Sequence, residues 1–160
     1  MKEIINRTLI HALDGYNSHL PAKTVLEGLT AKVSGSSLPG APYTIWQLIG
    51  HINFWQVRFI AHLKGQKLTE VPLVEDGWPY DKSPADEGEL KAVIKALLDG
   101  IAEVRQLLER GADLKHPPNY DSGFDVVTSM ATHLSYHLGQ VMTLRRMLGD
   151  YPPPSGSYIW

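Results

Sequence analysis

The sequence predicts an all-α protein, a four-helix bundle with one short extra helix and long loops between the helices. Apolar residues recur every three or four positions in four long segments, and alternating strand patterns are nearly absent. Glycine and proline mark the loops that separate these segments. A chain of 160 residues has the length of one domain, so we expect a single bundle domain over residues 1–160.

The first expected helix spans about residues 2–14, where apolar residues share one face, and it ends near Gly15. A shorter helix is expected after Pro21 and continues to Leu29. The loop "SGSSLPGAP", residues 34–42, then interrupts the helical pattern.

The second long helix opens with a capping box, in which Thr44 and Gln47 satisfy free backbone N–H groups at the start of the helix. The segment "TIWQLIGHINFWQVRFIAHLKG" continues the helical period for about five turns and ends at Gly65. The linker "QKLTEVPLVEDGWPYDKSP" follows it, and a non-periodic stretch of this length in a small domain is usually functional or packed across an opening. Its Trp78 and Tyr80 are candidates for the rim of a pocket.

The third long helix is expected to begin with Ser83 as N-cap, Pro84 at the first helical position and Asp86 at the third. Its apolar residues alternate spacings of four and three, the pattern of a bundle seam: Leu90, Ile94, Leu97, Ile101, Val104 and Leu108. The last helix begins at Ser122, with Asp125 three residues later, and continues to Gly149.

Charge and composition exclude several classes of partner. The chain has 15 basic and 17 acidic residues, and no run of like charge is longer than the pair Arg145-Arg146, so we expect no nucleic-acid or anionic-membrane partner. Charged residues interrupt the apolar ones in the first segment, and no segment reaches the length of a membrane span, so we expect a cytoplasmic protein. The chain has no cysteine, so any metal must be held by nitrogen and oxygen.

The stretch "THLSYHLGQ", residues 132–140, places His133 and His137 one helical turn apart. They are separated by about 40° around the helix and about 6 Å along it, so both imidazoles can reach one ion. Two hydrogen-bonded core histidines are the commoner meaning of an HxxxH pattern. Leu134 stands where the glutamate of an HExxH motif would be, which excludes a metalloprotease helix of that type.

A catalytic zinc-like site needs a third ligand, and His51, in the middle of the second long helix, is the best candidate. Three imidazoles with one open position form a catalytic rather than a structural arrangement. A buried histidine bonded to a carbonyl is the alternative for His51 alone. His62 lies about 16 Å along the same helix from His51, too far to share an ion.

The remaining histidines are weaker candidates. His11 is on the first helix, and His19 and His116 are in loop-like surroundings typical of surface residues. Gln140, one turn after His137, is a candidate to contact a metal ligand or a substrate, and Tyr136 is a candidate hydroxyl donor. Packing is the commoner role for both.

Two segments together, "IWQLIGHINFWQ" and "HLSYHLGQVMTLRRMLG", resemble the DinB/YfiT-like family of four-helix-bundle metalloenzymes over nearly the whole chain. The matching residues are Pro39, Gly40, Pro42, Tyr43, Thr44, Trp46, Gln47, Leu48 and His51 in the first motif, and His133, His137, Gly139 and Gln140 in the second. The resemblance implies a divalent metal ion, nickel or zinc, held by His51, His133 and His137. It also implies a homodimer, which is common in the family.

Two functions fit these residues and this resemblance. The first is a metal-dependent enzyme that activates a water or a low-molecular-weight thiol, for hydrolysis or for thiol transfer to an electrophilic small molecule. Some relatives transfer such thiols, and a chain without cysteine suits a thiol supplied from outside. The second is a non-catalytic metal- or small-ligand-binding bundle that acts through protein partners. The general base is not identified by the sequence, because no acidic residue lies near the HxxxH pair on its inward face.

Overall fold

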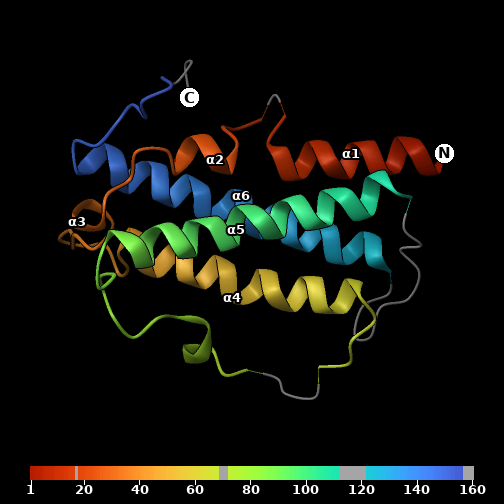
Figure 1. Cartoon of the computed structure of the whole chain (residues 1–160), viewed down its shortest axis with the longest axis horizontal. Helices are drawn as coiled ribbons and strands as arrows, with labels where there is room; N and C mark the ends of the chain where they lie inside the picture. Colours follow the sequence, from red (N-terminus) through yellow and green to blue (C-terminus); the bar gives the residue numbers. More distant parts are fainter. Residues whose placement is uncertain (17, 69–71, 112–121, 157–160) are drawn as a thin grey trace.

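The computed structural model describes residues 1–16, 18–68, 72–111 and 122–156 (Figure 1). Helices and loops make up these residues, and no strand is present among them. The elements are α1 (Lys2–Asp14), α2 (Ala22–Val25), α3 (Ala31–Ser34), α4 (Ile45–Leu63), the 3₁₀ helix η1 (Glu75–Gly77), α5 (Glu87–Glu109) and α6 (Gly123–Met147). The predicted all-α fold with four long helices is confirmed.

The four long helices, α1, α4, α5 and α6, form the bundle (Figure 1). α4 packs against α5 and α6 on one side, and α1 packs against the same two helices on the other. α2 lies against α6, and α3 and η1 lie against α4. The facing surfaces of α4 and α6 therefore meet along the inside of the bundle, where a ligand site can be built from both helices.

Two apolar clusters fill the bundle. The first joins the α2 region, α4, α5 and α6, and includes Ile49, Ile52, Leu97, Leu134 and Leu138. The second lies between α1, α4, α5 and α6, and includes Leu9, Phe59, Val104, Val127 and Met130. The predicted α5 seam faces both clusters, since Leu90, Leu97, Val104 and Leu108 are at most 1% exposed.

Local capping sets the start of α4 as predicted. The Thr44 side chain accepts a hydrogen bond from the Gln47 backbone, and the Gln47 side chain accepts one from the Thr44 backbone. The same two side chains also hold the long linker, because Thr44 donates to the Lys82 carbonyl and Gln47 donates to the Pro79 carbonyl. The linker is therefore fixed against the first turn of α4.

The predicted start of α5 was wrong by one turn. The N-cap is Asp86, whose carboxylate accepts from the Glu89 backbone, and the helix begins at Glu87 rather than at Pro84. Glu89 in turn accepts from the backbone of Ala85. Pro84 is buried in the linker and Ser83 is exposed, so tertiary packing of the linker prevents the helix from starting earlier.

The short region after α1 also differs from the prediction. One helix was expected from Pro21 to Leu29, whereas α2 covers only Ala22–Val25 and a further turn, α3, follows at Ala31–Ser34. The last helix begins as predicted, with the Ser122 side chain accepting from the Asp125 backbone. None of the described helices combines the length and the apolar character needed to cross a membrane.

Arg145 ties the α2 region to the end of α6. Its guanidinium is 2% exposed and forms an ion pair with the Asp150 carboxylate at 2.7 Å. It also donates to the carbonyls of Val25 and Glu27 at 2.6 and 2.9 Å. The charge is therefore buried with several acceptors, which is the condition under which an arginine tolerates burial.

Candidate metal centre

Three histidines converge between α4 and α6. The Nε2 atoms of His51 and His133 lie 3.2 Å apart. The ring centroid of His137 lies 4.7 Å from that of His51 and 4.5 Å from that of His133. One nitrogen from each ring lies within 4.8 Å of the other two. The three residues that the sequence predicts as ligands are therefore close together.

The helices place these side chains as their spacing predicts. His133 and His137 are one turn apart on α6, and Leu134 between them is 2% exposed, which holds this face of α6 inside the bundle. His51 is next to Ile52, also 2% exposed, so α4 presents it to the same space. His51 and His137 are buried and His133 is half-buried.

The second ring nitrogen of two histidines is held by an acceptor. His51 Nδ1 lies 2.8 Å from the Gly77 carbonyl oxygen, and His137 Nδ1 lies 2.6 Å from the Gln140 Oε1. Each oxygen can only accept, so Nδ1 carries the proton and donates it in both rings. In the neutral rings Nε2 is then unprotonated, which is the form that binds a metal ion.

Two glycines allow the linker to reach His51. A Cβ on Gly77 would lie 3.4 Å from His51 Nδ1 and 3.2 Å from Trp55 Nε1. A Cβ on Gly50, inside α4, would collide with the Pro79 ring. The absence of both Cβ atoms lets the backbone of the linker pack directly on this turn of α4, and this places the Gly77 carbonyl at His51.

Aromatic rings form the walls around the histidines. Trp78 stacks on His51 with ring centroids 3.8 Å apart and 11° between the planes. Tyr43 in turn stacks on Trp78, with the two ring centroids 3.5 Å apart. Trp55 and Phe59 meet the His133 ring edge-on at 6.5 and 6.2 Å. These rings exclude water from the sides of the cluster.

All three imidazoles are neutral near pH 7. Burial, together with smaller contributions from charge repulsion by the neighbouring His137 and His51, lowers the pKa of His133 to about 4. Burial also lowers the pKa of His51, although the Gly77 carbonyl opposes the shift, and burial lowers the pKa of His137 against the effect of Gln140. Neutral imidazole is the metal-binding form, so protons do not block the site at this pH.

The family model described as DinB superfamily matches residues 23–141, a segment that contains all three histidines. The chain belongs to the DinB superfamily. This confirms the resemblance predicted from the two motifs, and the helical structure agrees with a DinB-like bundle. We find no significant match to a curated protein and none to a solved structure.

The other described histidines of this DinB-superfamily chain lie apart from the cluster. His11 stacks on Tyr16 at the end of α1, and the His19 ring contacts the Leu20 carbonyl. His62 is buried near the end of α4 and is not part of the group. His116, predicted at the surface, lies outside the described residues. Among the described residues, no carboxylate joins the three histidines.

Several features of the site were not predicted from the sequence. The Gly77 carbonyl is 26 positions from His51, and no local pattern identifies it as a partner. Tyr43 was quoted only as part of a motif, yet it supports Trp78 by stacking. Trp78 does border the site, as expected, whereas Tyr80 is 98% exposed and is not part of the cluster. Gln140 was a candidate to contact a metal ligand, although packing was the commoner role, and it is the hydrogen-bond partner of His137.

Proposed function

We propose that this protein is a metal-dependent enzyme whose divalent ion, nickel or zinc, is held by His51, His133 and His137. The proposal treats residues 1–160 as one DinB-like domain. The observation that carries it is the separation of 3.2 Å between the Nε2 atoms of His51 and His133. Two ligands bound tetrahedrally about 2.0–2.1 Å from one zinc ion are separated by about 3.3 Å.

The donor set fits such an ion. Three neutral imidazoles without thiolate suit zinc and nickel, which accept nitrogen ligands readily. The Gly77 and Gln140 oxygens fix the orientation of two of the rings, and outer hydrogen bonds of this kind raise the affinity of histidine sites for metal. Members of the DinB superfamily often bind metal, which supports the same assignment.

The chemistry of the site follows from three ligands and an open position. A divalent ion held there acts as a Lewis acid and lowers the pKa of a coordinated water or low-molecular-weight thiol toward neutrality. The chain contributes orientation through Gly77 and Gln140, and it excludes water through Trp55, Trp78 and Phe59. A thiol must come from outside, because the chain has no cysteine. The substrate is an electrophilic small molecule.

No carboxylate is assigned as general base. Glu75 and Asp76 of η1 precede Gly77 in sequence, but both are exposed. The Asp76 carboxylate accepts a hydrogen bond from the Leu73 backbone. The proposal therefore requires no acidic residue, since a nucleophile with a pKa near neutrality loses its proton directly to water or buffer.

The test is the metal content of the full-length protein. The protein is expressed with zinc or nickel, purified, and measured by mass spectrometry beside His51→Ala, His133→Ala and His137→Ala. His11→Ala is the matched control, because it removes a histidine on α1 that is outside the cluster. We expect one ion per chain in the native protein and in the control, with a loss of more than half in each cluster variant. Equal metal content in all five proteins would reject the site.

Turnover separates the reaction classes. The metal-loaded protein is incubated with chlorodinitrobenzene and a thiol such as bacillithiol, and separately with simple esters in water. Thiol-dependent product formation that is lost in His137→Ala supports a transferase, and ester cleavage lost in the same variant supports a hydrolase. A metal-loaded protein without turnover on either substrate set supports the non-catalytic binding bundle instead.

A further inference from the structure

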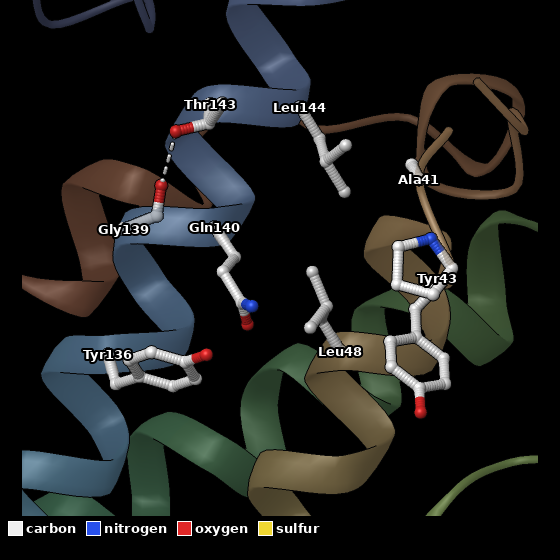
Figure 2. A pocket seen from close by; sticks show the side chains of 9 residues that line it. Ala41, Tyr43, Leu48, Tyr136, Gly139, Gln140, Thr143 and Leu144 are labelled. Atoms are coloured by element: carbon white, nitrogen blue, oxygen red, sulfur yellow. Dashed lines mark hydrogen bonds between the residues drawn. The ribbon is translucent and has the colours of Figure 1, made fainter. Parts of the chain in front are cut away.

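A separate cavity lies beside the histidines, between the segment that leads into α4 and the second half of α6 (Figure 2). Its volume is about 340 Å³, and Tyr43, Leu48, Tyr136, Gly139, Gln140 and Leu144 are among the residues that line it. We call it the Gln140 pocket. None of the three histidines lines it, so it is a neighbouring space rather than the coordination site itself.

The lining of the Gln140 pocket is apolar with a few polar groups and no charge. Figure 2 shows Leu48 from α4 and Leu144 from α6 pointing toward one another, with the Gln140 side chain extending from α6 beside them. The Thr143 hydroxyl is used within the helix, because it donates to the Gly139 carbonyl at 2.9 Å. The remaining polar side-chain groups of the lining residues are the Gln140 amide and the hydroxyls of Tyr43 and Tyr136.

The oxygen of the Gln140 amide is hydrogen-bonded, whereas its NH₂ group is available to a ligand. Its Oε1 accepts the proton of His137 Nδ1, which fixes the orientation of the amide. Its Nε2 group donates no hydrogen bond within the part of the chain that the structure describes. Tyr136 is 66% exposed at the edge of the same space. The pocket therefore offers hydrogen-bond donors to an acceptor on a ligand, within apolar walls.

Two residues that line the pocket also hold histidines of the metal centre in place, either directly or through another ring. Gln140 lines the pocket and holds His137. Tyr43 lines the pocket and stacks on Trp78, which stacks on His51. A molecule in the pocket is thus separated from His137 by one residue, Gln140, and from His51 by two, Tyr43 and Trp78.

We propose that the Gln140 pocket binds an uncharged small molecule that combines an aromatic or alkyl group with a carbonyl-type acceptor. The apolar part lies between Leu48 and Leu144, and the acceptor receives a hydrogen bond from Gln140 Nε2. The role of the pocket as the substrate subsite of the metal centre rests on the function proposed above, whereas its ligand chemistry does not depend on the metal.

The probe for this proposal is benzamide, which has a ring and a carbonyl acceptor but no charge. Benzoate is the matched comparison, because it has the same ring with a carboxylate that finds no cation in the pocket lining. Both are titrated into ¹⁵N-labelled full-length protein, without zinc and with zinc, while the side-chain amide signal of Gln140 is followed by NMR. We expect saturable shifts with benzamide at a Kd on the order of 1 mM, as for a small fragment, and at least about tenfold weaker binding of benzoate.

The second part of the experiment fills the pocket with a larger side chain. Leu144→Phe adds volume inside the pocket, and Leu148→Phe makes the same change one turn further along, against the same apolar cluster but outside the pocket. We expect Leu144→Phe to weaken benzamide binding at least about tenfold and Leu148→Phe to leave it within about twofold. If Leu144→Phe does not fold, Gly139→Leu replaces it, because a Cβ there meets no atom within 4 Å.

The outcomes separate the pocket from the metal. Benzamide binding without any zinc binding supports the ligand site and overturns its link to a metal centre. Zinc binding without saturable benzamide shifts at Gln140 overturns the pocket and leaves the metal proposal intact. Benzoate binding as tightly as benzamide, or unchanged benzamide binding in the filled variant, also overturns the proposal.

Discussion

His51 Nε2 on α4 and His133 Nε2 on α6 lie 3.2 Å apart, although 82 positions separate the two residues in the chain. His51 Nδ1 already donates to the Gly77 carbonyl, so its Nε2 is unprotonated in the neutral ring and can only accept. In the metal-free protein His133 therefore supplies the proton between them. An ion that replaces this proton would find two nitrogen ligands at nearly the separation it needs.

Gln140 is expected to orient His137 for metal binding. Gln140→Leu removes the acceptor of the His137 Nδ1 proton, and loss of such a partner weakens metal affinity by about 10- to 100-fold. Gln140→Glu retains an acceptor and should keep the affinity within about tenfold of the native value. A competition titration with a chromophoric zinc chelator measures both. Equal affinity in Gln140→Leu and the native protein would show that this hydrogen bond does not orient the ligand.

Metal affinity should depend only weakly on pH near neutrality. Three imidazoles with the ordinary pKa of about 6.5 would lose about fifty-fold in affinity between about pH 7.5 and about pH 6, because protons compete for the nitrogens. Burial lowers all three pKa values here, that of His133 to about 4, so the free site holds few protons to displace. We therefore expect a loss of less than about tenfold over this range. The same chelator titration, carried out at both pH values, measures this loss of zinc affinity. A fifty-fold loss would contradict the lowered pKa values.

The same substitution at two helical glycines should have opposite effects. Gly139→Ala adds a Cβ to open space in α6 and should raise the free energy of unfolding by about 0.5–1 kcal/mol, because alanine favours the helix. Gly50→Ala places its Cβ against the Pro79 ring and should lower the free energy of unfolding by about 1–3 kcal/mol. Urea denaturation of both variants measures this. Stabilisation by Gly50→Ala would show that the linker does not pack on α4 as described.

Arg145 and Arg146 are adjacent but should differ in importance. Arg145→Met removes a buried guanidinium and leaves the Asp150 carboxylate and the Val25 carbonyl without their donor. We expect this to cost about 3–5 kcal/mol of stability. Arg146→Met is the matched control on the exposed side of α6, where its cation–π contact with Tyr151 is worth less than about 1 kcal/mol. Similar urea midpoints for the two variants would contradict the structural role of Arg145.

The long helices could be predicted because local chemistry determines them. The reciprocal hydrogen bonds of Thr44 and Gln47 and the Ser122 cap are contained within one helical turn, and the apolar period of α5 extends over its whole length. The start of α5 was misplaced because Ser83 and Asp86 are both good caps, and the choice between them depends on the buried Pro84. α3 was missed because a helix of four residues has too short a pattern to detect.

The site divides in the same way between local and distant contacts. His133, His137 and Gln140 lie within two turns of one helix, so their proximity can be read from spacing alone. The Gly77 carbonyl and the Trp78 ring reach His51 only through the path of the linker. Gly77 and Gly50 were the residues in the sequence that could have indicated the close approach of the linker to α4. A glycine alone, however, does not reveal which neighbour approaches it.

Zinc K-edge X-ray absorption of the full-length protein, loaded with one equivalent of zinc, tests the central claim most directly. The account predicts three imidazole nitrogens about 2.0–2.1 Å from the ion and one further light ligand. It also predicts that His51→Ala loses this signature while His11→Ala retains it. Zinc that is not retained at one equivalent, or an unchanged imidazole shell in His51→Ala, would contradict a metal centre built from α4 and α6.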